Sequence, residues 1–402
     1  MSTSLKKSFI MQAGIRQTSV LSVIVLMMVP QNLSASENSQ QQADLIIENG
    51  IVYDGSLAPS QRQDIVVRDG KIIFVGDNAA GQFQATKIVH ASGKVVMPGF
   101  IDPHTHAGEE LSDPEKAANL NYLSQGVTTV FIGNDGHGLA NIAEQKSLFE
   151  SHGIGTNVGI YVGHGGVRRS VMGVEDRAPN DAEMAEMKTL VSTAMSDGAI
   201  GLSTGLFYVP GAFASTDEVI ELASIAGRMG GVYDTHLRDE STYSIGVLGA
   251  IEETLDIGLK ANIPVNFSHI KALGVDVWGY STQIIDRVNK ARAAGQAVTA
   301  DQYPWRASGT SVTAALMPKW SLAGGFEAMV ARMDDPEQMP KIREEMTDNL
   351  RRRGGAEAVL ITGRIDNEMA QSIIGKNLKE IAADWGVSAI DAAIKPVRAG
   401  GA

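Results

Sequence analysis

Two histidines, His104 and His106, stand one residue apart at the end of the apolar stretch GFIDPHTH. In a β-strand, side chains two residues apart point to the same face of the sheet. Two neutral imidazoles on one face can bind a single cation, and imidazole is a common ligand of zinc. The His-x-His spacing alone is a weak motif, so the prediction of a metal site depends on further ligands elsewhere in the chain.

Such ligands follow other apolar runs. Asp135 comes after GVTTVFIG, His236 ends GGVYDTH and His269 ends IPVNFSH. Together with His104 and His106 they supply four imidazoles and one carboxylate, which is enough to hold one or two divalent ions. Three or four such ligands that leave an open position on the ion are typical of a catalytic site.

Alternating strands and helices from Gly99 onward would position these side chains. Helical patterns such as those of residues 181–198 and 216–231 separate most of the apolar runs. Alternating βα units of this number predict a parallel barrel of the TIM type, where functional groups gather at the C-terminal ends of the strands. Seven runs are predicted as strands: GFID, GVTTVFIG, NVGIYVG, GAIGLSTG, GGVYDTH, IPVNFSH and QAVTADQYP.

The chain upstream of the barrel has a different pattern. Residues 43–97 contain short Ile/Val runs separated by NG, DG and SG turns, which predict a small antiparallel sheet or sandwich. The polar, turn-rich residues 36–42 are predicted to be a linker. The expected domain order is therefore linker, β-sandwich and barrel, with the barrel covering residues 98–402.

Residues 1–35 predict an export signal. Basic residues precede the apolar run VLSVIVLMMV, and small residues follow it at LSA. The run is too short to span a bilayer comfortably, so we expect cleavage after Ala35 rather than an uncleaved anchor. The product would be periplasmic or secreted from a bacterium, with no stable membrane association after removal of the signal.

Composition excludes several classes of function. The 402 residues include no cysteine, which rules out disulfides, thiol nucleophiles and zinc sites built on cysteine. The net charge is -12, and it would become -15 after loss of the signal with its three basic residues. Such an acidic protein is not expected to bind a nucleic-acid backbone.

Seven motifs, in order, resemble the N-acyl-D-amino-acid deacylase (D-aminoacylase) family of metal-dependent amidohydrolases. The likeness covers roughly residues 43–390. It implies a β-sandwich beside an (α/β)₈ barrel, and hydrolysis of N-acyl-D-amino acids to a carboxylate and a free D-amino acid. The motifs are GFIDPHTH, QGVTTVFIGNDG, VGHGGVRRSVMG, GAIGLSTGLFYVPGAFASTDEVIELA, THLRDE, FSHIKALG and ADQYPWRASGT.

The resemblance also assigns roles to the metal ligands. It implies that His236 and His269 hold a tightly bound zinc ion, while His104 and His106 form a second, weaker site. Asp135 stands where studied members carry a bridging cysteine. An oxygen ligand can also bridge two metals, but it is harder than a thiolate and broadens the expected metals from Zn²⁺ to Mn²⁺ or Co²⁺.

The same resemblance implies a substrate site. Lys271 and Tyr303 would bind the α-carboxylate of the small N-acyl amino acid, as an ammonium and a phenol can both donate to an anion. Ser308 lies near the position of a further polar contact of the family. Lys271 is two residues from His269, so we expect it on the same face of a strand.

The general acid–base of the family, an aspartate that ends the eighth strand, has no counterpart in this sequence. From Pro318 onward the chain is predicted to be helical, and residues 375–394 resemble the helix before that strand. We therefore expect a barrel without its last strand, from a C-terminally truncated chain, and we identify no catalytic acid–base.

Two alternatives stay open at this point. One is another amidohydrolase, such as a hydantoinase, a dihydroorotase or an isoaspartyl dipeptidase. These commonly bridge their metals with a carboxylated lysine after strand four, but residues 198–211 contain no lysine. The other is a non-catalytic remnant, because a barrel that lacks a strand leaves two unpaired edges.

Overall fold

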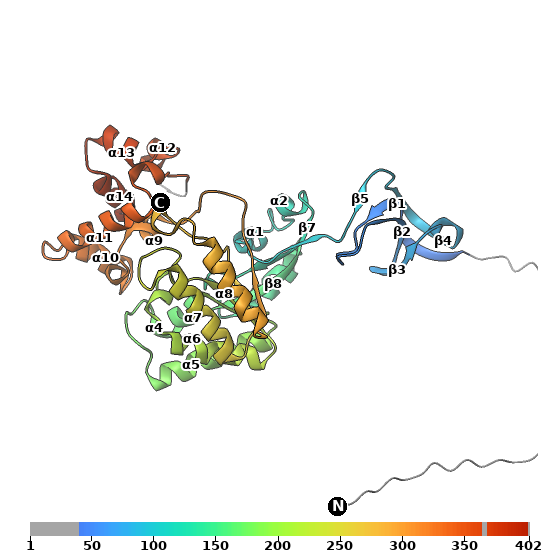
Figure 1. Cartoon of the computed structure of the whole chain (residues 1–402), viewed down its shortest axis with the longest axis horizontal. Coiled ribbons are helices and arrows are strands. Elements are labelled where there is room, and N and C mark those ends of the chain that lie inside the picture. The colour runs from blue at the N-terminus through green and yellow to red at the C-terminus, as the bar shows by residue number, and fades with distance from the viewer. Residues whose placement is uncertain (1–39, 364–367, 401–402) are drawn as a thin grey trace, which may run out of the picture. The chain divides into compact units, whose positions relative to one another are not determined.

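The structure, a computed structural model, describes residues 40–363 and 368–400 (Figure 1). Contacts divide the chain into two units, Met1–Pro98 and Gly99–Ala402, and each is described by itself. The predicted export signal, residues 1–35, lies outside the described residues, as does most of the predicted linker. The last linker residues, Gln41 and Gln42, already belong to the first strand of the N-terminal sheet.

The N-terminal unit contains a five-stranded sheet with the order β3-β2-β1-β4, and β5 also pairs with β1. The antiparallel prediction is correct for β1–β2 and β2–β3, but wrong for β4 and β5, which run parallel to β1. After β3 the chain crosses to the far side of β1 instead of making another hairpin. In residues 40–98 there is one sheet rather than two packed sheets. The strands are β1 Gln41–Val52, β2 Gln61–Arg68, β3 Lys71–Gly76, β4 Phe83–His90 and β5 Val95–Val96.

The second unit is built on a parallel sheet of seven strands, each paired with its neighbours in sequence. Each of the seven predicted runs contains one strand, so this prediction is confirmed. In the described residues, β6 and β12 form the two edges of the sheet. The strands are β6 Phe100–Asp102, β7 Val127–Ile132, β8 Asn157–Gly163, β9 Gly201–Gly205, β10 Val232–His236, β11 Val265–Phe267 and β12 Val298–Ala300.

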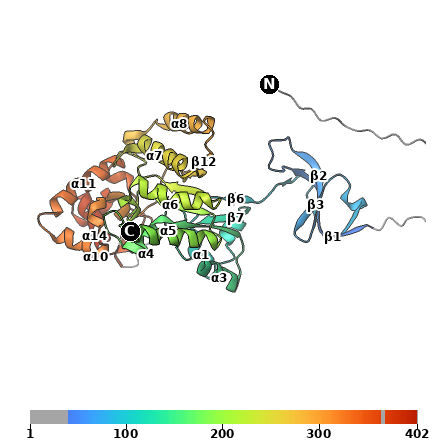
Figure 2. The same ribbon diagram turned by 90° about the horizontal axis from the view of Figure 1, so that it is seen from below.

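Helices between the strands cover this sheet, and α5, α6 and α7 run side by side (Figure 2). The start of α5 is fixed by a capping box, where Asn180 accepts hydrogen bonds from the helix and Glu183 bonds back to Asn180. Leu202, Val219 and Phe267 are fully buried in the core that joins sheet and helices. The helices are α1 Gly108–Ser112, α2 Leu120–Leu123, α3 Ile142–His152, α4 His164–Met172, α5 Asp181–Ser196, α6 Thr216–Arg228, α7 Gly246–Ala261 and α8 Ser281–Ala293.

The chain after β12 forms helices with a core of their own. The prediction of a single helix for residues 375–394 is wrong. Helix α13 ends at Gly386, which has the left-handed conformation, and α14 begins after its N-cap residue Ser388. Among the described residues, no helix has both the length and the hydropathy to cross a bilayer. These helices are α9 Val312–Leu316, α10 Phe326–Asp334, α11 Met339–Arg352, α12 Glu368–Ile373, α13 Leu378–Trp385 and α14 Ala389–Arg398.

The core beneath β11 should control the stability of the parallel sheet and the helices that cover it. Replacing fully buried Phe267 by alanine removes a ring and leaves a cavity, so we expect the free energy of unfolding to fall by about 3–5 kcal/mol. Urea denaturation followed by circular dichroism measures this. Ile285→Ala, on the exposed side of α8, is the control and should change stability by less than about 0.5 kcal/mol. Equal effects of the two variants would contradict the assigned core.

Candidate metal centre at the strand ends

Asp135 lies in a tight loop after β7, where its backbone has the left-handed conformation with φ of 57°. The next residue, Gly136, donates its N–H to the hydroxyl of Ser203 on β9 at 3.1 Å. A Cβ atom on Gly205 would lie 2.1 Å from the carbonyl oxygen of Asp135, so only glycine allows the loop to approach β9 this closely. The loop with the sequence GNDGHG therefore holds the carboxylate of Asp135 above the sheet.

His104 and His106 both point to this carboxylate from the loop after β6. Their Nε2 atoms lie 3.5 and 3.4 Å from Oδ2 of Asp135. Both residues lie beyond the end of the strand, so the expected strand geometry is not what aligns them. The intervening Thr105 donates its N–H and its hydroxyl to the carbonyl oxygen of Phe131 on β7, and this fixes the loop.

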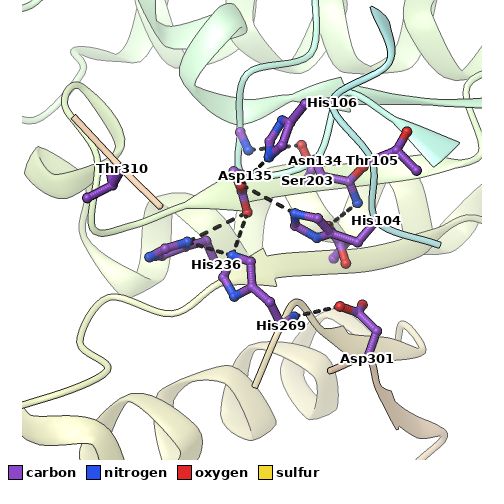
Figure 3. A network of polar contacts seen from close by, with 12 residues as sticks. His104, Thr105, His106, Asn134, Asp135, Ser203, His236, His269, Asp301 and Thr310 are labelled. Carbon is purple, nitrogen blue, oxygen red and sulfur yellow. Dashed lines mark hydrogen bonds and ion pairs between the residues drawn. The ribbon is translucent and has the colours of Figure 1, made fainter. Parts of the chain in front are cut away.

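His236 and His269 approach the other carboxylate oxygen (Figure 3). Nδ1 of His236 lies 3.7 Å and Nε2 of His269 lies 3.2 Å from Oδ1 of Asp135, and these two ring nitrogens are 2.9 Å apart. The structure thus brings all five predicted ligands together. The oxygens of Asp135 divide them into two pairs, with Oδ2 facing His104 and His106, and Oδ1 facing His236 and His269.

The charges in this cluster shift one another's pKa values. Burial would raise the pKa of Asp135, but the four histidines outweigh it and hold that pKa well below its usual range. Burial would lower the pKa of His269, but Asp135 and Glu240 raise it to about 9. The pKa of His236 is lowered, because burial outweighs its neighbouring carboxylates. Without a metal, the buried carboxylate is thus stabilised by protons on neighbouring rings.

The residues fit a metal ion. In the described part of the chain, three buried atoms of the cluster have no hydrogen-bond partner: Oδ1 of Asp135, Nδ1 of His104 and Nε2 of His236. The separations of 3.2–3.7 Å between Asp135 oxygens and ring nitrogens are close to the ~3.3 Å between neighbouring ligands of a tetrahedral zinc ion. Imidazole and carboxylate ligands suit Zn²⁺, and a carboxylate also suits Mn²⁺.

Below the cluster, polar side chains inside the sheet connect the strand ends. Asp234 is fully buried on β10 and accepts hydrogen bonds from the amides of Asn134 at 3.0 Å and Asn266 at 2.9 Å. Asn266 also donates to Asp301, which in turn accepts the backbone N–H of His269 at 2.6 Å. Burial raises the pKa of Asp234 to about 6. This network fixes the loops that carry Asp135 and His269.

The predicted substrate residues differ in how close they lie to the cluster. Nζ of Lys271 lies 2.7 Å from Nδ1 of His269 and 5.5 Å from the ring centre of Tyr303. Both residues lie beyond their strands, so Lys271 reaches the site from a loop. Ser308 is exposed and shares with them only a cavity of about 1130 Å³ that they line together.

Glu240 is the functional candidate that the sequence analysis missed. This buried carboxylate lies 2.5 Å from Nζ of Lys271, and its oxygens lie 3.3 Å from Nδ1 of His269 and 3.8 Å from Nε2 of His236. Burial would raise its pKa, but His236, His269 and Lys271 lower it to about 2. Its position four residues after His236, in the motif THLRDE, was the available signal.

Comparisons with known proteins identify D-aminoacylases and N-acyl-D-amino-acid deacylases among the relatives of this chain. No protein-family model matches the chain. The chain is 37% identical over 298 residues to a D-aminoacylase of Alcaligenes xylosoxydans xylosoxydans. The aligned residues cover 68% of this chain and 60% of the relative. The chain therefore spans about 60% of the length of this curated relative.

Two solved structures are similar over 88% of this chain. One is an N-acyl-D-glutamate deacylase from Bordetella bronchiseptica in complex with zinc and a phosphonate inhibitor that mimics the tetrahedral intermediate. It has a TM-score of 0.72, 29% identity and 70% of its chain covered. The other is a D-aminoacylase with a binuclear metal centre, with a TM-score of 0.71, 31% identity and 69% of its chain covered.

The raised pKa of His269 predicts how the metal-free protein responds to pH. A group whose pKa is higher in the folded state stabilises the fold fully below its unfolded pKa, and this stabilisation is lost as the pH rises through the folded pKa. We expect the melting temperature of chelator-treated protein to fall between pH 6.5 and about 9. The fall should be smaller in His269→Gln and unchanged in His90→Gln, a control in the N-terminal sheet. An equal fall in His269→Gln would contradict this electrostatic role.

Proposed function

Because this chain belongs to the D-aminoacylase family of amidohydrolases, we propose that it hydrolyses the amide bond of N-acyl-D-amino acids at a metal centre. The observation that carries this proposal is the single carboxylate of Asp135, which faces two histidine pairs from separate strand ends. The products would be a carboxylate and a free D-amino acid. Small N-acyl amino acids are the proposed partners.

Asp135 and the four histidines would hold one or two Zn²⁺ ions, with Mn²⁺ or Co²⁺ as possible substitutes. When bound, such an ion supplies Lewis-acid activation of water and of the amide carbonyl. The side-chain oxygens of Asp135 divide the histidines into two pairs, which supports a bridging role for this residue. Metal binding would release the protons that the cluster holds in the metal-free state.

Lys271 and Tyr303 would orient the substrate through its α-carboxylate. An ammonium group and a phenol both donate hydrogen bonds to an anion, and both side chains line the cavity of about 1130 Å³ next to the cluster. A fixed carboxylate keeps the acyl amide in one place relative to the histidines, and such positioning lowers the entropic part of the barrier. Ser308, on the exposed rim, would contact more distant parts of the substrate.

The departing amine must receive a proton from a general acid. The resemblance places an aspartate for this step after an eighth strand, and no strand of the parallel sheet follows β12 within residues 301–363 and 368–400. We therefore assign no described residue to this role. The apolar run of residues 20–29 supports a further proposal, that the protein is exported and acts in the periplasm or outside the cell.

A substrate panel tests the proposed activity. Zinc-loaded protein should release free amino acid from N-acetyl-D-leucine and N-acetyl-D-glutamate, and much less from the L-enantiomers. Chelation should abolish the release and added zinc should restore it, because the ion activates the water. Turnover of hydantoin or dihydrouracil instead would favour a cyclic amidase. Zinc uptake without any hydrolysis would favour a non-catalytic protein.

Substitutions of Asp135 test its role as the bridging ligand. Asp135→Asn removes the negative charge between the histidine pairs, and should weaken zinc binding by at least about 100-fold. Asp135→Cys supplies a softer thiolate, which should raise the preference for zinc over manganese and make the activity sensitive to peroxide. Competition titrations with a zinc indicator and assays after peroxide treatment measure both effects. A Cys variant with unchanged metal preference and oxidation resistance would argue against this account.

A further inference from the structure

Glu240 and Asp135 lie at opposite ends of the same two imidazole rings. His236 faces Asp135 with Nδ1, at 3.7 Å, and Glu240 with Nε2, at 3.8 Å. His269 faces Asp135 with Nε2, at 3.2 Å, and Glu240 with Nδ1, at 3.3 Å. Each ring therefore lies between two buried carboxylates. The contact of Glu240 with His269 is within hydrogen-bond reach, whereas its contact with His236 is longer than a hydrogen bond. When a ring is neutral, only one of its nitrogens can carry the lone pair that binds a metal.

We propose that Glu240 is a positioning residue that accepts the N–H of His269 and so fixes it on Nδ1. The lone pair of His269 is then on Nε2, which faces Asp135, where the metal would bind. This inference rests on the metal centre of the proposed function. A carboxylate that accepts the second N–H of a metal-binding histidine fixes the orientation and the tautomer of the ring.

Lys271 makes this role necessary. Its Nζ lies 2.7 Å from Nδ1 of His269, and an ammonium group can only donate hydrogen bonds. A hydrogen bond from Lys271 to Nδ1 would require the lone pair at that atom, and would leave the N–H on Nε2, where the metal should bind. Glu240 removes the conflict, because its carboxylate accepts from both Lys271, at 2.5 Å, and His269.

The position of Lys271 also argues against a metal ion held by Glu240 itself. Ligand atoms of His236, Glu240 and His269 lie within 4.8 Å of one another, which is close enough for a metal site. However, the ammonium group of Lys271 lies 2.5 Å from Oε1 of Glu240 and already compensates its charge. A cation in the same place would be repelled, so we infer that the carboxylate accepts from His269 and Lys271 instead.

Zinc affinity tests the proposal without a measurement of activity. In a competition titration with a chelating indicator, Glu240→Gln should bind zinc about 10–100-fold more weakly than the unaltered protein. Glu253→Gln is the matched control. Glu253 is also a largely buried carboxylate, and it holds the same loop through Arg238, but contacts neither histidine. We expect the control to bind zinc like the unaltered protein.

The outcomes separate this inference from the proposed function. If the unaltered protein binds no zinc, the metal centre itself is wrong, and the role of Glu240 falls with it. If the unaltered protein binds zinc and Glu240→Gln binds it equally well, only the role of Glu240 is overturned. Equal losses in Glu240→Gln and Glu253→Gln would assign the effect to the loop and would also overturn it.

A spectroscopic measurement keeps the proposal testable if Glu240→Gln does not fold. Long-range proton–nitrogen correlation spectra of zinc-loaded protein with ¹⁵N-labelled histidine report which ring nitrogen carries the proton. We expect His269 to carry it on Nδ1. The signals are assigned by single His→Gln substitutions among the eight histidines. A proton on Nε2 of His269 would overturn the proposal.

Discussion

The burial of one carboxylate among four imidazoles is the constraint on which the rest of this site depends. Asp135 is almost fully buried, and an isolated buried carboxylate would cost several kcal/mol of stability. Its charge is compensated only if rings from the loops after β6 and β11 and from the end of β10 all reach it. If one of these loops is distorted, the charge of Asp135 is therefore no longer fully compensated.

The backbone meets this constraint through close packing and a buried polar network. The left-handed conformation at Asp135 turns its side chain to the centre, and the close approach at Gly205 leaves no space for a side chain there. The hydrogen bonds between Asn134, Asp234 and Asn266 then connect the loop after β7 with strands β10 and β11. A polar network of this kind is stabilising only when its members are satisfied, so it favours one arrangement of the loops.

The sequence allowed prediction of the strands and the five clustered residues, because each strand is an apolar run and the polar residue at or just after its C-terminal end is easily recognised. Glu240 could not be found in this way, since it lies in a loop and its burial arises only when the loops after β10 and β11 pack together. The parallel pairing of β4 with β1 depends on a crossover that turn motifs do not specify. Gly386 is a local signal for the end of a helix, and it explains why residues 375–394 form two helices instead of the one predicted.

The two histidine pairs differ in their access to water, and this difference follows from the elements that carry them. His236 is buried against Phe207, whose ring stacks on it at 5.8 Å between centroids. His269 lies beside His236 and makes an edge contact with the ring of Tyr303. In the other pair, His104 is about as buried as His269, with 11% and 12% of the side chain exposed, but the side chain of His106 is 64% exposed. Electrostatic attraction between an ion and its ligands is stronger where water is excluded. Water therefore screens the charge of Asp135 less on the side of His236 and His269 than on the side of His106.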